Sequence, residues 1–211
     1  GLFFSGVLKY GLGACRVVKG SSITEAISNA TAVLKEGGLV DGVAWYDDAF
    51  KDLIKRKNDI VRHMSVGISE REFKLYLQPQ IDLATNEIVG AEALCRWDSE
   101  TLGFLAPDSF IPLFEKNGRI VELDYFMLER ACESYAELSS LDAAPPTFAV
   151  NFSRSTIIQQ DFADTLASTV ERFGIARSAL EIEITETAFS VDEDAVIGIV
   201  EALQSAGFLI A

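Results

Sequence analysis

The stretch Gly90-Ala91-Glu92-Ala93-Leu94-Cys95-Arg96-Trp97 places an acid and a base four residues apart in an otherwise largely apolar run. Side chains alternate between the two faces of a β-strand, so a strand here would put Glu92 and Arg96 on the same face. Charges on a buried strand are costly unless they are paired or bind a metal ion. Either this face meets water, or the two charges pair with each other, or the face carries a binding site.

Polar residues also interrupt one face of two later apolar stretches. In residues 148–153 the alternation puts Asn151 opposite the large apolar side chains, and in residues 180–185 it does the same for Glu183. Strands of a parallel sheet that are buried on both faces are normally almost continuously apolar. We therefore interpret Asn151 and Glu183 as candidate site residues near the carboxyl ends of their strands, although polar residues there also serve as ordinary loop caps.

Apolar periodicity, capping patterns and turn residues predict strands that alternate with helices. The predicted strands cover residues 2–18 (one or two strands), 43–46, 73–83, 87–97, 147–153, 179–187 and 208–211. The predicted helices cover residues 22–36, 47–66, 108–117, 119–141, 156–173 and 190–206. Strands and helices that alternate with short connections indicate an α/β fold built from parallel βα units with right-handed crossovers.

The opening stretch also resembles a known signature. Glu92-Ala93-Leu94, followed by Arg96-Trp97, resembles the motif of the EAL family of cyclic di-GMP phosphodiesterases. Further segments resemble other motifs of that family in the same order: Leu77-Gln78-Pro79, Phe110-Ile111-Pro112-Leu113-Phe114-Glu115, Val150-Asn151-Phe152-Ser153 and Glu183-Ile184-Thr185-Glu186. Leu77 stands where the family usually has an aromatic residue, and Phe114 where it usually has alanine. The resemblance covers residues 73–211.

The resemblance implies a (β/α)₈ barrel of the TIM type, which typically needs about 250 residues. Residues 69–211 would supply the first half of such a barrel. The family's aspartate pair, its later lysine and its last glutamate and glutamine would lie beyond Ala211. We therefore expect the 211 residues alone to bind metal poorly and to hydrolyse nothing.

The resemblance also implies a metal site. Its ligands would be Glu92, Asn151 and Glu183, which are oxygen ligands of the kind that Mg²⁺ and Mn²⁺ prefer. Such ions lower the pKa of bound water and clamp the attacking and leaving oxygens of a phosphodiester. By the same resemblance Glu92, Glu183 and Glu186 are the catalytic acids, and Glu186 would steady the loop that carries later ones.

The resemblance assigns the substrate-binding residues too. Arg96 would hold a phosphate of cyclic di-GMP through charge-assisted hydrogen bonds, and Gln78 and Leu94 would contact the nucleotide. Each assignment has a structural alternative: Gln78 as an ordinary edge-strand amide, and Glu186 as an acid that only precedes a helix. For Glu115 and Asp124 we favour structural roles at the rim of the barrel.

The residues before the barrel resemble, more loosely, the end of a GGDEF domain. We predict a remnant of an α+β GGDEF-like domain over residues 1–46, a linking helix over 47–68, and the EAL segment over 69–211. An unrelated αβ cap or sensor remnant is the alternative for residues 1–46. The GGDEF signature itself would precede Gly1.

Composition and net charge limit the partners and the cellular location that the sequence predicts. The net charge of −14 argues against a nucleic-acid polymer as partner, and any phosphate site must be built locally from a few cations or metal ions. No apolar run is long enough to span a membrane, so this segment predicts no membrane contact. Three scattered cysteines indicate a reducing, cytoplasmic setting, although the parent protein could be anchored by another segment. The single histidine, His63, gives little support to catalytic triads.

Two functions compete. The first is metal-dependent hydrolysis of cyclic di-GMP to linear pGpG in bacterial second-messenger signalling. The second is a non-catalytic receptor or interaction module on the same fold, which would pass a signal through the helix over residues 47–66. An unrelated αβ metal enzyme is a third alternative. The family resemblance also suggests a homodimer through the EAL domain.

Overall fold

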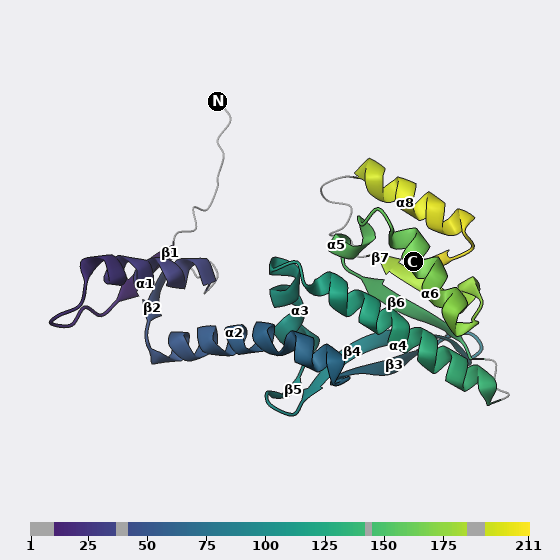
Figure 1. The fold of residues 1–211 in the computed structure, drawn as a ribbon, viewed down its shortest axis with the longest axis horizontal. Coiled ribbons are helices and arrows are strands. Elements are labelled where there is room, and N and C mark those ends of the chain that lie inside the picture. The colour runs from purple at the N-terminus through teal and green to yellow at the C-terminus, as the bar shows by residue number, and fades with distance from the viewer. Residues whose placement is uncertain (1–10, 37–41, 142–144, 185–192) are drawn as a thin grey trace. The chain divides into compact units, whose positions relative to one another are not determined.

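The computed structural model describes residues 11–36, 42–141, 145–184 and 193–211 (Figure 1). The chain divides into two compact units, Gly1–Ile60 and Val61–Ala211, and helix α2, Asp48–Ser69, contributes to both. Each unit is described by itself. None of the described helices combines the length and the apolar character that a membrane span requires.

The first unit contains a small βαβ arrangement. Strand β1, Gly11–Cys15, lies parallel to strand β2, Gly42–Tyr46, and helix α1, Ile23–Glu36, connects them in sequence. The backbone amide of Phe50 donates to Asp47 Oδ1 at 2.9 Å, which caps the start of α2. These elements confirm the predicted strand over 43–46 and the helix after Ser22. Helix α2 runs three residues past the predicted end, and residues 2–10 lie outside the described part.

The second unit contains a sheet with its helices. Its strands are β3 (Phe73–Ile81), β4 (Ile88–Ser99), β5 (Gly103–Leu105), β6 (Thr147–Phe152), β7 (Leu180–Ile184) and β8 (Leu209–Ile210). Its helices, besides the end of α2, are α3 (Pro107–Lys116), α4 (Ile120–Ser140), α5 (Arg154–Ile157), α6 (Phe162–Phe173), the short 3₁₀ turn η1 (Arg177–Ala179) and α8 (Glu193–Ser205).

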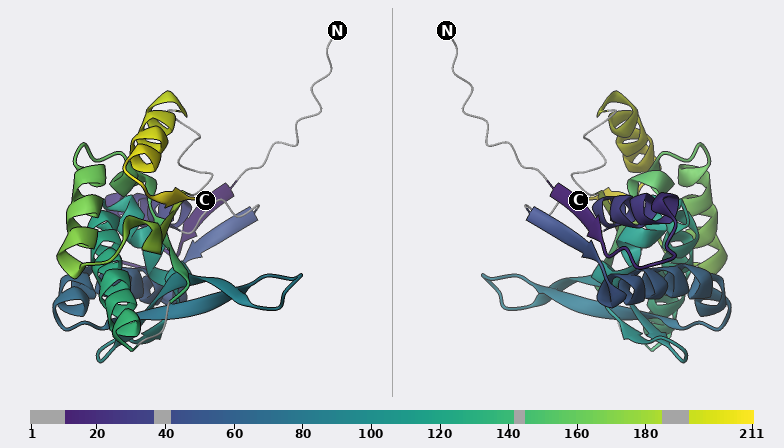
Figure 2. Two further views of the ribbon diagram at one scale, coloured as in Figure 1. Left: turned by 90° about the vertical axis from the view of Figure 1, so that its right-hand side faces the viewer. Right: turned by 90° about the vertical axis from the view of Figure 1, so that its left-hand side faces the viewer.

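The sheet has the strand order β3-β4-β6-β7-β8, and β5 pairs with β4. Strands β4, β6, β7 and β8 are parallel to one another, whereas β3 runs antiparallel to β4. The far end of the β3–β4 hairpin extends beyond the other strands (Figure 2). The parallel pairs joined through helices confirm the predicted α/β organisation.

The two faces of the sheet differ in chemistry. One face carries the apolar stripe of each strand and packs against the helices. Its buried core includes Ala91, Ala93, Phe148, Val150, Phe152, Leu180 and Ile182 from the strands, and Leu128, Ala131, Leu166, Val170 and Leu203 from the helices. The opposite face carries Glu92, Asn151 and Glu183, because side chains alternate along each strand.

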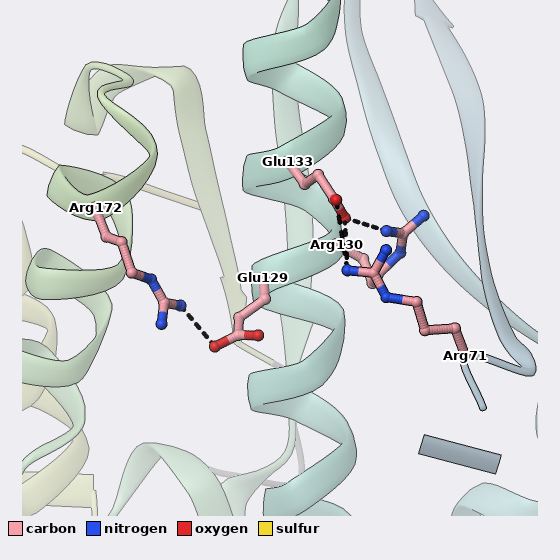
Figure 3. Close-up of polar contacts among 5 residues, drawn as sticks. All are labelled: Arg71, Glu129, Arg130, Glu133 and Arg172. Carbon is pink, nitrogen blue, oxygen red and sulfur yellow. Dashed lines mark hydrogen bonds and ion pairs between the residues drawn. The ribbon is translucent and has the colours of Figure 1, made fainter. Parts of the chain in front are cut away.

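Ion pairs tie helix α4 to its neighbours on both sides (Figure 3). Arg172 of α6 donates to Glu129 at 2.6 Å. On the other side Glu133 lies against Arg130 and Arg71, with 3.3 Å between Arg71 Nη2 and Glu133 Oε2. Arg71 sits in the turn between α2 and β3, where its φ of 54° is left-handed. The start of β3 is therefore anchored to α4.

One predicted helix was wrong, and one strand was missed. The single helix predicted over residues 156–173 is two helices, because the chain turns after α5 and the amide of Phe162 donates to the carbonyl of Gln159 at 3.1 Å. Strand β5 was not predicted. Gly174 ends α6 as expected, with φ of 67°. The predicted strand over 179–187 is described only as far as Ile184, and Ser190 lies outside the described residues.

Candidate functional site

The candidate site lies on the polar face of strands β4, β6 and β7. In the parallel registers, Glu92 is opposite Ala149 and Asn151 is opposite Glu183. Paired residues share a face, and so do residues two apart on one strand, so the side chains of Glu92, Asn151 and Glu183 all project to the same side. The structure thus brings together the three residues that the sequence analysis nominated as metal ligands.

Asn151 links these groups. Its side-chain Nδ2 donates to Glu92 Oε1 at 2.9 Å. The Asn151 side chain is exposed, and Glu92 and Glu183 are partly buried. The sheet therefore holds an amide and two carboxylates from adjacent strands within reach of one another, on a surface open to a ligand.

The nearby acidic side chains affect the pKa of Glu183. Partial burial raises the pKa of Glu183, and the negative charges of Glu92 and Glu181 raise it further. The hydrogen bond from Asn151 opposes that rise in the pKa. Two carboxylates that disfavour each other's charge on one face favour a cation between them.

The donor chemistry fits a hard divalent cation. Carboxylate and amide oxygens are ligands that Mg²⁺ and Mn²⁺ accept, and rotation of the Asn151 amide would present its Oδ1 in place of the nitrogen. Among the described residues, no three histidine, cysteine or acidic side chains form a metal-binding group by themselves. The candidate set is two carboxylates and one amide, and an ion there would keep positions for water or substrate.

Arg96 lies further along β4 on the same face. Its Nη1 donates to the carbonyl of Cys95 at 2.7 Å, and its guanidinium carbon is 5.9 Å from the centre of the Tyr76 ring on β3. Between the described residues Glu92 and Arg96 the structure shows no ion pair, so the pairing considered in the sequence analysis does not form. Arg96 keeps hydrogen-bond donors for an anionic ligand.

Strand β3 brings two more side chains to this face. Gln78 is directly opposite Glu92, and Tyr76 is opposite Leu94. Gln78 and Leu94, which the sequence analysis nominated as substrate-binding residues, thus lie on the same face as Glu92. Tyr76 was not nominated, although it precedes Gln78 by two residues and the strand alternation could have found it. Glu181 was also missed. Glu186 lies outside the described residues.

Asp124 on α4 has a structural role at this end of the sheet. Its Oδ2 accepts hydrogen bonds from the Ser153 backbone amide at 2.9 Å and from Thr156 Oγ1 at 2.6 Å, which fastens α5 directly after β6. Burial raises the pKa of Asp124, and the hydrogen bonds from Thr156 and Ser153 oppose that rise. Asp124 also lines a cavity of about 240 Å³ with Asn151 and Leu94. These contacts bear out the favoured structural role of Asp124.

Comparison with known proteins gives a consistent result. The EAL domain family matches residues 61–211. The chain is 30% identical over 176 residues to the biofilm architecture maintenance protein MbaA of Vibrio cholerae, which covers 82% of this chain and 22% of that protein. It is 35% identical over 141 residues to the cyclic di-GMP phosphodiesterase NbdA of Pseudomonas aeruginosa, which covers 67% of this chain and 18% of that protein. The chain thus spans about a fifth of the length of these relatives.

Solved structures agree. The PaMucR phosphodiesterase in complex with c-di-GMP superposes with a TM-score of 0.68 at 28% identity, over 72% of this chain and 62% of that one. The S helix-GGDEF-EAL structure of Vibrio cholerae LapD superposes with a TM-score of 0.65 at 17% identity, over 95% of this chain and 48% of that one, and so shows likeness of fold alone. By family match, relatives and fold together, this chain belongs to the EAL domain family.

Proposed function

We propose that this chain forms part of a phosphodiesterase that hydrolyses cyclic di-GMP. The observation that carries the proposal is the convergence of Glu92, Asn151 and Glu183 on one sheet face, with the Asn151 Nδ2 to Glu92 Oε1 contact at 2.9 Å, and Arg96 on the same strand as Glu92. Carboxylates that can hold a cation, beside an arginine that can hold a phosphate, suit cleavage of a phosphodiester. The names of NbdA and PaMucR support the same substrate.

The reaction consumes one water molecule. The water oxygen forms a bond to phosphorus, the bond from phosphorus to one ribose 3′ oxygen breaks, and the leaving oxygen takes a proton. The product of this single cleavage is the linear dinucleotide pGpG. Arg96 would bind a non-bridging phosphate oxygen, while Gln78, Leu94 and Tyr76 would orient the nucleotide over the strands.

We infer that Mg²⁺ or Mn²⁺ is required. A bound divalent ion would supply activation of the attacking water and neutralisation of charge at the phosphate. Glu92, Asn151 and Glu183 would hold it, and the rise in the pKa of Glu183 caused by burial and neighbouring acids would then be reversed by the ion's positive charge. By the family resemblance Glu186, which lies outside the described residues, would steady the loop that carries later catalytic acids.

The proposal extends to the architecture. The sheet would be part of a (β/α)₈ barrel, with residues 69–211 contributing its first half. Residues 1–46 would belong to a GGDEF-like domain, and residues 47–68 would form a linking helix. The EAL domain would provide the interface of a homodimer, and the protein would act in the cytoplasm. Likeness of fold to a GGDEF-EAL structure over 95% of the chain supports the domain assignment.

A receptor without catalysis is the second candidate. Arg96, Tyr76 and Gln78 would form a binding surface on β3 and β4 that needs no metal ion, and the contacts of the Arg96 guanidinium with Cys95 and Tyr76 support this candidate. Such a protein would bind cyclic di-GMP and leave it intact.

Hydrolysis of cyclic di-GMP by the full-length protein with Mg²⁺ separates the candidates. We expect pGpG from the wild type and none from Glu92→Ala, while Glu87→Ala, which removes an exposed acid from the β3–β4 turn, keeps the activity. Binding without product in the wild type would favour the receptor. Neither binding nor product would reject both functions.

A further inference from the structure

The inference concerns Glu72, a buried acid at the entrance to the sheet. Glu72 lies between the end of α2 and the start of β3 and is only 8% exposed. A buried carboxylate is costly unless its oxygens accept hydrogen bonds. The role of Glu72 therefore depends on which groups donate hydrogen bonds to its carboxylate.

Glu72 accepts hydrogen bonds from one short piece of β4 and the turn that follows it. Trp97 Nε1 donates to Oε2 at 2.8 Å, and the Glu100 amide donates to Oε1 at 3.0 Å. The Asp98 amide donates to the Glu72 carbonyl at 3.0 Å. One residue thus holds the segment that directly follows Arg96.

These bonds fix how β3 pairs with β4. Phe73 is opposite Trp97, and Tyr76 is opposite Leu94, so the Tyr76 ring reaches Arg96 only in this register. A slip of one residue would send every side chain of a strand to the other face. The Glu72 contacts sit at the end of the hairpin nearest Arg96, where they oppose such a slip directly.

The end of α2 packs closely against the same tryptophan. A Cβ atom at Gly67 would come within 2.9 Å of both Trp97 Nε1 and Phe73 Cε2. Both rings are almost fully buried, at 0% and 1% exposure, so neither can move aside cheaply. Arg119 further fastens this part of α2 by donating to the Val61 carbonyl at 3.1 Å. Both Glu72 and Gly67 therefore restrict the position of the Trp97 ring near its Nε1 atom.

We propose that Glu72 is a positioning residue for ligand binding, which acts through Trp97 and the β3–β4 register to hold Arg96 beside Tyr76. This inference rests on the proposed function, because it assigns Arg96 to the phosphate of cyclic di-GMP.

The test compares Glu72→Gln with Glu70→Gln in the full-length protein. Both substitutions remove one negative charge at the same turn, but Glu70 is exposed. The amide that replaces the Glu72 carboxylate has a single acceptor oxygen and can keep only one of the two side-chain hydrogen bonds. We therefore expect KM for cyclic di-GMP to rise about tenfold with a smaller change in kcat. Gly67→Ala should raise KM in the same direction, and Glu70→Gln should leave KM unchanged.

A spectroscopic readout reports the contact without activity. The indole ¹H–¹⁵N resonance of Trp97, assigned by its loss in Trp97→Phe, should shift in Glu72→Gln and stay in place in Glu70→Gln. An unchanged KM in Glu72→Gln, or a fall in melting temperature with no change in KM, would overturn the positioning role while the wild type still hydrolyses its substrate. If the wild type binds cyclic di-GMP without hydrolysis, the same comparison applies to Kd. A wild type that neither binds nor hydrolyses cyclic di-GMP would overturn the proposed function, and the positioning role with it.

Discussion

Arg96 is the residue on which ligand binding is expected to depend most. Its guanidinium is held by the Cys95 carbonyl and the Tyr76 ring, so little conformational freedom is lost when it binds an anion. Its planar fork can also bind two phosphate oxygens at once, which a lysine cannot do.

Arg96→Ala should weaken binding of cyclic di-GMP by at least about tenfold, because one charge-assisted contact is lost. Arg96→Lys should recover only part of the affinity. Calorimetric titration without divalent metal measures Kd in the absence of turnover. Arg172→Ala is the matched control, since it removes an exposed arginine from α6. Equal losses in the two alanine variants would contradict the role of Arg96.

Asp124 should make stability depend on pH in an unusual direction for an acid. Burial raises the pKa of its carboxyl above the ordinary value of 3.8, so the folded state binds the proton more tightly than the unfolded state. Its contribution is therefore fully present below pH 3.8 and is lost as pH rises through the folded pKa. Asparagine does not titrate, so the melting temperature of the wild type should fall relative to that of Asp124→Asn as pH rises through the folded pKa.

A second substitution checks the hydrogen bonds of Asp124. Asp124→Ala leaves the Ser153 amide and the Thr156 hydroxyl without their acceptor, and should cost about 1–3 kcal/mol of unfolding free energy. Denaturant titration measures that difference. A cost near zero would mean that α5 does not depend on Asp124.

Single residues were predictable where alternation alone decides their placement. Glu92, Asn151 and Glu183 follow from the polar stripe of each strand, and neighbouring parallel strands bring such stripes together. The contacts of Glu72 and Tyr76 depend on which residues of β3 and β4 lie opposite each other, and neither strand's sequence alone predicts that register. These contacts with Trp97 and Arg96 were therefore found only in the structure.

At the scale of elements, α4 is joined to the turn before β3 and to α6 by ion pairs that differ in exposure (Figure 3). Glu133 is 29% exposed and faces two arginines, whereas Glu129 is 49% exposed and pairs with Arg172. Exposed single pairs contribute little, while less exposed networks contribute more.

Glu133→Gln should therefore lower the unfolding free energy by about 1 kcal/mol, and Glu129→Gln by at most about 0.5 kcal/mol. Thermal or urea unfolding at low and high salt gives both values. The larger effect should shrink as salt is added, because ions screen the charges. An equal cost in both variants would show that the anchor of β3 to α4 is not electrostatic.

The elements that were predicted share strong local signals. The hairpin over residues 73–97 combines long apolar strands with a turn, and α6 ends at Gly174 in the left-handed conformation. The break between α5 and α6 was missed because an Asp124 contact, distant in sequence, holds α5. Strand β5 was missed because three residues carry too little periodicity.

At the scale of the whole molecule, the two compact units should respond differently to a ligand. Cyclic di-GMP with Mg²⁺ should protect the amides of β4, β6 and β7 from hydrogen exchange in the full-length protein, and leave those of β1 and β2 unchanged. Mass spectrometry of peptic peptides distinguishes the two sets. Protection confined to the first unit would place the ligand elsewhere and contradict the proposed site.

The order of elements along the chain was enough to predict an α/β fold, because helices between strands leave few other arrangements. The sequence predicts a linking helix over residues 47–68 between the two parts, and the contacts divide the chain after Ile60, within α2. The exact residue at which α2 passes from one unit to the other has no local sequence signal, because it depends on what each part of the helix packs against.

The antiparallel direction of β3 decides at which end of the sheet helix α2 leads into it. Because β3 runs against β4, its first residue, Phe73, lies beside Trp97 at the end of the sheet that carries Arg96. Had β3 run parallel, the polypeptide would arrive at the opposite rim, roughly 30 Å away along a nine-residue strand. The reversed strand therefore brings the end of α2, which precedes it in the chain, to the same end of the sheet as Arg96, the end at which the proposed ligand would bind.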